Sequence, residues 1–162
     1  MLAALAGGVG AARFLRGLVR VVPPEEVVAI VNTADDDVFH GLHVSPDLDS
    51  VTYTLAGAEH PEQGWGLAGE TFAAMDAIER YGVPTWFRLG DRDLATHLHR
   101  TELLRRGATL SEATEQIARA IATIVSDGDL RAELSRRGLT QAAKFSIDRY
   151  RERVEALYAS LR

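Results

Sequence analysis

The sequence predicts an α/β protein with a Rossmann-like, partly parallel sheet and helices, followed by a helical C-terminal extension. An apolar run, Leu2–Ala6, ends in a cluster of three glycines, and a helical pattern begins directly behind it. A second apolar run, Val27–Val31, is β-branched without polar alternation, which predicts a fully buried strand. Strand, glycine turn, helix and strand in this order are typical of the first half of a doubly wound sheet.

The glycine turn predicts a phosphate site. Gly7, Gly8 and Gly10 let the backbone approach a bulky anion, and the free N–H groups of the following helix attract one. The turn is similar to a dinucleotide fingerprint at Gly8 and Gly10, but Arg13 stands where the third glycine belongs. An NAD site is therefore disfavoured, and the arginine favours a diphosphate ligand.

Length and composition narrow the class of protein. A chain of 162 residues fits one domain, or one domain with a small appendage. Its formal net charge of −5 disfavours a nucleic-acid partner, and the lack of cysteine excludes disulfides and thiolate metal sites. No run approaches the ~20 apolar residues that span a bilayer, and the N-terminus lacks the pattern of a signal peptide. We therefore expect a cytoplasmic protein that acts on small molecules.

Acidic residues follow the second predicted strand. Asn32 and the acids 35–37 come after this strand, so they are expected beside the glycine turn at the carboxyl edge of the sheet. Asp47 and Asp49 follow Ser45 and Pro46, which predict a helix start at this point. Asp35, Asp47 and Asp49 could hold Mg²⁺ on a diphosphate. The alternatives are a solvated loop for residues 35–37 and simple matching of the helix dipole for the other two acids.

The rest of the chain reads as loops and helices. Trp65 lies in a glycine-rich loop, where it either packs on the core or forms the wall of an aromatic ligand pocket. A helical stretch is expected to follow His97 and to run to Arg106. His97 and His99 would point apart on a helix, which disfavours a metal site made by this pair. Residues 109–112 form a capping box and predict that a helix begins there.

Six segments then resemble one family, in the same order along the chain. The family is that of the 2-phospho-L-lactate transferases (CofD, called FbiA in actinobacteria) of coenzyme F-420 biosynthesis, and the resemblance covers residues 1 to about 121. The segments are 7–13 (GGVGAAR), 31–35 (VNTAD), 45–49 (SPDLD), 65–66 (WG), 89–97 (LGDRDLATH) and 110–114 (LSEAT).

The resemblance implies a Mg²⁺-dependent transferase. Its acceptor would be the deazaflavin alcohol Fo, and its donor a guanosine diphospho compound that carries lactate or phosphoenolpyruvate. The ribityl hydroxyl of Fo would attack the phosphorus that bears the organic acid, and GMP would leave. Catalysis would then depend on positioning and charge stabilisation. A homodimer is possible for such a transferase.

The resemblance also implies roles for individual residues. Asp49 and Arg88 match the Fo-binding aspartate of the family and its basic partner. The glycine turn and Asn32 would serve the donor or the pocket at the end of the sheet, and Asp47 would be a ligand of the metal or of the acceptor substrate. We further hypothesise that Asp49 is catalytic, in that it orients the attacking hydroxyl.

The chain departs from the family after its first part. Family members are longer, and from about residue 124 this chain instead resembles the C-terminal tail of GT-B glycosyltransferases, in segments 129–139 (DLRAELSRRGL) and 143–149 (AKFSIDR). We therefore predict a transferase part over residues 1–122 and a helical extension over 123–162. Two alternatives to an active transferase follow. One is a non-catalytic module that binds phosphate or Fo, and the other is an inactive chimeric fragment.

Overall fold

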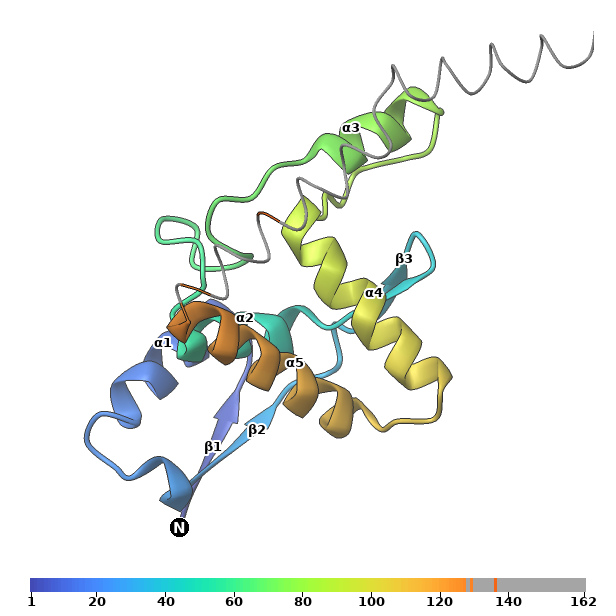
Figure 1. Ribbon diagram of the computed structural model, residues 1–162. Helices are drawn as coiled ribbons and strands as arrows, with labels where there is room; N and C mark the ends of the chain where they lie inside the picture. Colours follow the sequence, from blue (N-terminus) through green and yellow to red (C-terminus); the bar gives the residue numbers. More distant parts are fainter. Residues whose placement is uncertain (128, 130–135, 137–162) are drawn as a thin grey trace, which may run out of the picture. The chain divides into compact units, whose positions relative to one another are not determined.

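The computed structural model describes residues 1–127, 129 and 136 (Figure 1). Residue contacts divide the chain into two units, Met1–Thr123 and Ile124–Arg162. The predicted boundary after residue 122 and the predicted helical extension stay predictions, because most of residues 128–162, including the glycosyltransferase-like segments, lie outside the described residues. Within the described part, no helix is long and apolar enough to cross a membrane.

The strand–helix–strand unit forms as the sequence predicts. Strands β1 (Leu2–Ala6) and β2 (Val27–Val31) pair in parallel, in register from Leu2 opposite Val27 to Ala6 opposite Val31. Helix α1 (Gly8–Leu18) follows the first strand, and a 3₁₀ turn (Pro24–Glu26) precedes the second. Figure 1 shows α1 and the two strands at the N-terminal end of the chain. The Rossmann-like α/β class is thereby confirmed.

One face of this sheet carries the first core cluster. Ala4 and Ala6 of β1 are buried against Ala12 and Leu15 of α1, together with Val51 of helix α2 (Pro46–Ala56). Small side chains on the strand let the helices approach the sheet closely, so larger apolar residues of the helices fill the space between the layers.

The opposite face of the sheet is exposed. It carries Ala3 and Leu5 of β1, which lie opposite Val28 and Ile30 of β2, and Leu5 is 83% and Ile30 54% exposed. The prediction that the second strand is fully buried is therefore wrong. An apolar run without alternation indicates that both faces of a strand accept apolar neighbours. Within the described residues, however, only the face that carries Ala4 and Ala6 is covered.

A β-hairpin follows that the sequence analysis did not predict. Strands β3 (Asp37–Phe39) and β4 (Leu42–Val44) pair antiparallel across His40 and Gly41, which both have positive φ angles (53° and 79°). Two consecutive positive φ angles are typical of the tight hairpin turns. The pair His-Gly is an unusual sequence for such a turn, and the strands are short, so the pattern gave little signal.

Three further helices complete the described part. Helix α3 (Ala73–Arg80) packs with Val44 and Leu89 in a second core cluster centred on Met75. Helix α4 (Asp91–Arg105) begins well before the helical stretch that we expected to follow His97. Helix α5 (Leu110–Ser126) begins at the predicted capping box, in which Thr109 N–H donates to Glu112 Oε2 (2.8 Å) and Glu112 N–H donates to Thr109 Oγ1 (3.3 Å).

Candidate functional site

A cavity of about 300 Å³ opens between the glycine turn, the first turn of α2 and helix α4. It lies beyond the carboxyl end of β1, where ligands bind in open parallel sheets. The predicted site residues Gly8, Asp47, Asp49 and Arg88 all line it. The other lining residues are Val9, Val44, Pro46, Ser50, Tyr53, Trp65, Gly66, Phe87, Leu89, Asp93 and His97.

The glycine turn lies against Asp47. A Cβ atom at Gly7 would come within 3.3 Å of Asp47 Oδ2, and Gly8 has a φ of +67°, which glycine adopts without strain. Asn32 Nδ2 donates to Asp47 Oδ2 (2.9 Å) and to Asp35 Oδ2 (3.3 Å). The structure thus brings two predicted metal ligands and the predicted donor-site amide together beside the turn.

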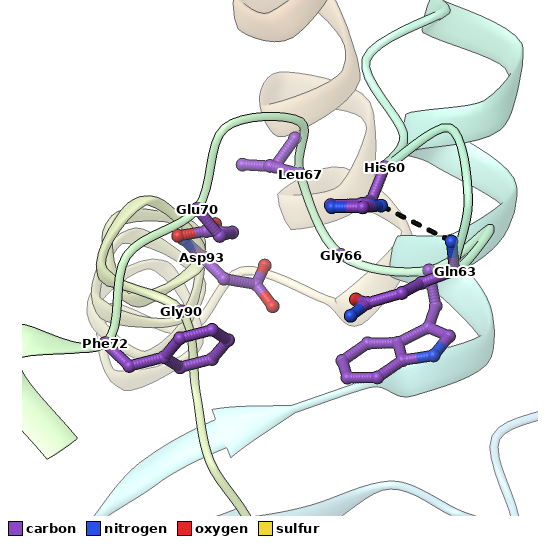
Figure 2. Close-up of a pocket in the computed structure, with 9 residues that line it drawn as sticks. His60, Gln63, Gly66, Leu67, Glu70, Phe72, Gly90 and Asp93 are labelled. Atoms are coloured by element: carbon purple, nitrogen blue, oxygen red, sulfur yellow. Dashed lines mark hydrogen bonds between the residues drawn. The ribbon is translucent and has the colours of Figure 1, made fainter.

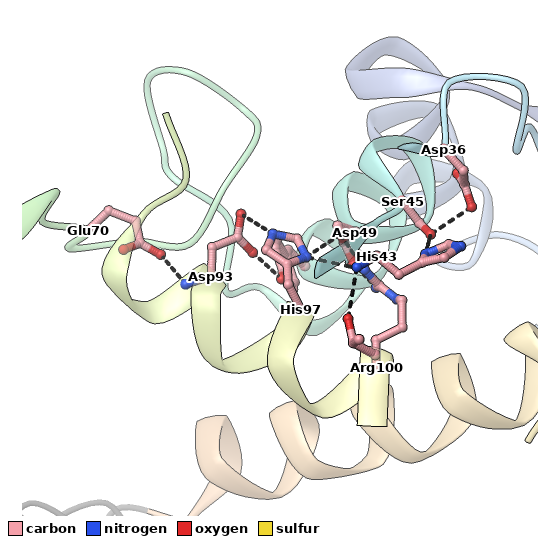
Figure 3. Close-up of polar contacts among 10 residues, drawn as sticks. Asp36, His43, Ser45, Asp49, Glu70, Asp93, His97 and Arg100 are labelled. Carbon is pink, nitrogen blue, oxygen red and sulfur yellow. Dashed lines mark hydrogen bonds and ion pairs between the residues drawn. The ribbon is translucent and has the colours of Figure 1, made fainter. Parts of the chain in front are cut away.

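This group suits Mg²⁺ by the chemistry of its donor atoms. Mg²⁺ in proteins is commonly held by one or two carboxylates and completes its octahedral shell with water and substrate phosphates. Asp35 and Asp47 supply two carboxylates that approach the same amide nitrogen, and the N-terminus of α1 beside them attracts phosphate. The neighbouring Asp36 does not join this group of possible metal ligands, because its carboxylate accepts a hydrogen bond from the Ser45 hydroxyl (2.7 Å, Figure 3). The Ser45 side chain makes no capping hydrogen bond to α2.

Gly10 and Arg13 lie apart from this group. Nothing stands within 4 Å of the position that a Cβ atom on Gly10 would take. The guanidinium of Arg13 lies against Gly64, in the loop between α2 and α3, where a Cβ atom on Gly64 would meet Arg13 Nη2 at 2.7 Å. Gly8 lines the cavity and Gly7 lies against Asp47, whereas Gly10 and Arg13 do neither. The predicted phosphate-binding roles of Gly10 and Arg13 therefore have less geometric support than those of Gly7 and Gly8.

Replacement of Gly10 by alanine tests the role of this glycine. The substitution should stabilise the protein by about 0.5–1 kcal/mol, because alanine favours the interior of a helix and meets no neighbour here. Urea denaturation measures the change, with Gly17→Ala in the same helix as the matched control. If Gly10→Ala lowered the stability and Gly17→Ala did not, another part of the protein would have to approach the backbone closely at Gly10.

Asp49 is buried and forms an ion pair with Arg100. Both of its oxygens accept hydrogen bonds from the guanidinium, Oδ2 from Nη1 (3.0 Å) and Oδ1 from Nη2, and the whole arginine is only 1% exposed (Figure 3). Burial raises the pKa of the Asp49 carboxyl, while the hydrogen bonds and charge of Arg100 act in the opposite direction. Burial would lower the pKa of Arg100, but Asp49 outweighs this effect and raises it, so the guanidinium stays charged.

A second pair, buried His97 and half-buried Asp93, lies beside the first. His97 is 1% exposed, with Nε2 3.4 Å from Asp93 Oδ2 and Nδ1 3.8 Å from Asp49 Oδ2, and the Tyr53 hydroxyl donates to Asp93 Oδ1 (2.5 Å). Burial acts to raise the pKa of Asp93, but the hydrogen bonds of His97 and Tyr53 outweigh this effect and lower that pKa. Burial and the nearby charges of Asp49 and Asp93 raise the pKa of Tyr53, which keeps its proton and donates.

Asp49, Asp93 and His97 also offer ligand atoms within 4.8 Å of one another. A cation there would compete with Arg100, which already engages both oxygens of Asp49, and the arginine charge would repel it. The arrangement therefore favours a network of paired charges over a metal centre. As expected for a helix, His97 points inward while His99 is exposed.

Arg88 borders the cavity but has other partners than Asp49. Its guanidinium forms an ion pair with Asp76 of α3 and lies 3.9 Å from Glu79, and it sits over the ring of Phe72. The basic partner of Asp49 is Arg100, which the sequence analysis missed. The sequence does contain a pattern that indicates this partner. Asp93, His97 and Arg100 are spaced so that they share one face of a helix, once the helix is known to begin at Asp91.

A smaller hollow of about 60 Å³ (Figure 2) shares Trp65, Gly66 and Asp93 with this cavity. Glu70 and Phe72 line it, together with His60, whose Nδ1 accepts a hydrogen bond from Gln63 N–H (3.3 Å). Trp65 lines both spaces and is 50% exposed, so its indole is not a core residue and suits a wall against an aromatic ligand.

Comparison with known proteins identifies chains that are similar to this one. The family model of "2-phospho-L-lactate transferase CofD" matches residues 2–127. A phosphoenolpyruvate transferase of Kitasatospora aureofaciens is 55% identical over 116 residues, which are 70% of this chain and 36% of the relative. A phosphoenolpyruvate transferase of Mycobacterium tuberculosis is 48% identical over 127 residues, 70% of this chain and 38% of the relative. The chain thus spans little more than a third of the length of these relatives.

Proposed function

Because the chain belongs to the family of 2-phospho-L-lactate transferases, we propose that it transfers a phospholactate or phosphoenolpyruvate group from a guanosine diphospho donor to Fo in coenzyme F-420 biosynthesis. One observation carries this proposal. Gly8 of the glycine turn and Asp47 line the same cavity as Asp49 and Arg88, so an anion-binding region and a second polar region face one space.

The donor side of the cavity is the glycine turn. The first N–H groups of α1 lack partners within the helix and bind the diphosphate, and Gly7 and Gly8 allow its close approach. Asp47 and Asp35 would hold Mg²⁺, and Asn32 orients both carboxylates by donating to each of them. When bound, Mg²⁺ neutralises charge on the diphosphate and on the departing GMP.

The acceptor side is formed by Asp49 and Arg88, with Trp65 as an aromatic wall. Each oxygen of Asp49 keeps lone-pair capacity beyond its hydrogen bond to Arg100, so the carboxylate accepts a hydrogen bond from the Fo hydroxyl and orients it. The hydroxyl oxygen forms the new bond to phosphorus, the bond from phosphorus to the bridging oxygen of GMP breaks, and the hydroxyl proton passes to water. The cytoplasmic location and the homodimer remain predictions.

The test follows GMP release and Fo fluorescence together. The protein is mixed with Fo, Mg²⁺ and either a lactyl or an enolpyruvyl donor, and GMP is quantified by chromatography. We expect GMP only when all three are present, and we expect Asp47→Asn to lower the apparent affinity for Mg²⁺ by roughly tenfold or more, about 1.4 kcal/mol. Asp37→Asn, on an exposed strand position, is the matched control.

The two readouts separate the outcomes. If folded protein released no more GMP than the background reaction, the transferase proposal would be overturned. If Fo fluorescence still changed on titration in that case, the chain would be a binding module, and if neither signal changed it would be an inactive fragment.

A further inference from the structure

The loop that carries Trp65, residues 59–67, is a compact unit. Its two end residues form an antiparallel bridge with each other. Inside the loop, His60 N–H donates to the carbonyl of Gly66 (3.0 Å), and the carbonyl of His60 accepts from Gly64 N–H (2.8 Å). A loop with paired ends and internal hydrogen bonds moves as one piece, so the place of Trp65 depends on what the loop contacts outside itself.

The loop lies against one face of helix α1. Val9, Arg13 and Arg16 stand four and three residues apart, so they share this face of the helix. Arg16 forms an ion pair with Glu59 at one end of the loop. Gly64 is buried against the other two residues, since a Cβ atom at Gly64 would stand 2.8 Å from Val9 Cγ1 and 2.7 Å from Arg13 Nη2. The loop is therefore seated on α1 at two points.

Of the two contacts at Gly64, the one with Val9 is rigid. The guanidinium of Arg13 ends a long side chain and can swing aside, whereas a β-branched side chain on a helix has one strongly preferred rotamer. Val9 also lies in the first turn of α1 and lines the cavity together with Trp65. A side chain at residue 64 would therefore lift the loop from Val9, and Trp65, the next residue, would move with it.

We propose that Gly64 and Val9 are positioning residues, which seat the loop on α1 so that the Trp65 indole stands at the cavity as a stacking surface for the planar ring of the acceptor. This inference rests on the proposed function, because it takes the deazaflavin ring of Fo as the ring that stacks. Trp65 is 50% exposed, so half of its surface is accessible and the loop, rather than the core, holds it in place. Stacking depends on how the two rings are placed, so a displaced indole loses the contact.

The substitution Gly64→Ala is expected to displace Trp65. Trp65 and Trp86 are the two tryptophans of the chain, and Trp86 does not line the cavity, so all variants are made in a Trp86→Phe background. In Gly64→Ala, acrylamide should quench Trp65 fluorescence more strongly, because an indole lifted from the cavity wall is more accessible. Fo, followed by its own fluorescence, should bind roughly tenfold more weakly, the usual cost of losing one stacked aromatic side chain.

A second substitution should reverse the displacement. In Val9→Ala/Gly64→Ala, the methyl group added at residue 64 enters the space that shortening of Val9 leaves, so the loop returns to α1. The quenching of Trp65 and the affinity for Fo should return most of the way to their values in the background protein.

Gly82→Ala is the matched control for backbone strain. Gly82 has a φ of +78°, close to the +74° of Gly64, but no described residue stands within 4 Å of the position of its Cβ atom. This variant should lose stability, because a side chain is strained at such a φ angle, and it should leave both Trp65 quenching and Fo affinity unchanged.

A double-mutant cycle separates positioning from a general loss of structure. Trp65→Ala removes the indole and should weaken Fo binding about as much as Gly64→Ala does. In Gly64→Ala/Trp65→Ala no indole is left to displace, so the affinity for Fo should equal that of Trp65→Ala. Circular dichroism confirms that each variant is folded.

Three results would overturn the inference. One is unchanged quenching of Trp65 in folded Gly64→Ala. Another is a loss of Fo affinity in the double variant that equals the sum of the two single losses. The third is a Val9→Ala/Gly64→Ala protein in which Trp65 stays as displaced as in Gly64→Ala.

Val9→Ala alone carries the test if Gly64→Ala does not fold. It takes away the seat of the loop and leaves the glycine, so Trp65 quenching should rise and Fo affinity should fall, the latter only while Trp65 is present. Unchanged quenching, or a loss of affinity that persists in the Trp65→Ala protein, would contradict the inference. If wild-type protein fails to bind Fo, the proposed function fails, but the quenching of Trp65 in ligand-free protein still decides whether Gly64 and Val9 place this indole.

Discussion

Replacement of Arg100 by methionine is expected to lower the free energy of unfolding by about 3–5 kcal/mol, the cost of breaking a buried ion pair from one side. The guanidinium is 1% exposed and engages both oxygens of Asp49, so its removal leaves a buried acid without its main partner. Burial favours the protonated form of Asp49, and its protonation limits the loss, so the decrease in stability should grow as the pH rises. Urea denaturation at several pH values measures it.

Removal of both partners tests whether the lost stability comes from the unpaired charge. In the double variant Asp49→Leu/Arg100→Met both charges are gone, and most of the lost stability should return because two apolar side chains can pack in their place. Arg119→Met is the matched control. Its arginine pairs with Glu115 on the surface and is 78% exposed, so the change should be at most about 1 kcal/mol. A double variant as unstable as Arg100→Met would show that the shape of the pair, rather than its charge, holds α2 to α4.

The sequence predicted those elements whose signals are local. The run Leu2–Ala6, the glycines behind it and the run Val27–Val31 carry their own pattern, so strand, helix and strand form where expected. The capping box of α5 is equally local, because its two hydrogen bonds join Thr109 and Glu112. The exposure of Ile30 could not be predicted in this way, since it depends on which elements cover each face of the sheet.

The candidate site divides along the same line. Asn32 was expected near the glycine turn because strand order alone places it there, and the structure puts it beside Gly7 and in contact with Asp47. Arg100 was missed because its role depends on a partner 51 residues away and on where α4 begins. Gly90 has no polar side chain to mark it as the residue before this helix, so the helix was expected to begin too late.

The start of α4 is therefore the second place where one substitution should have a large effect. Gly90 lies directly before the helix, and the Glu70 carboxylate caps it by accepting hydrogen bonds from the N–H groups of Arg92 and Asp93, both at 2.9 Å. A Cβ atom at Gly90 would stand 2.3 Å from Glu70 Cδ, which is far too close for the two groups to coexist. In Gly90→Ala the glutamate must move, and the helix loses its cap.

The expected loss of stability in Gly90→Ala is about 1–2 kcal/mol, the usual cost of removing a helix cap. Glu70→Ala should cost nearly the same, and the double variant Gly90→Ala/Glu70→Ala should cost no more than either single one, because both remove the same two hydrogen bonds. Urea denaturation of the three variants forms the double-mutant cycle. If the two losses added instead, the alanine methyl would be displacing the backbone before α4 rather than the Glu70 side chain. The helix that carries Asp93, His97 and Arg100 would then be shifted as a whole, and Fo affinity should fall in Gly90→Ala but not in Glu70→Ala.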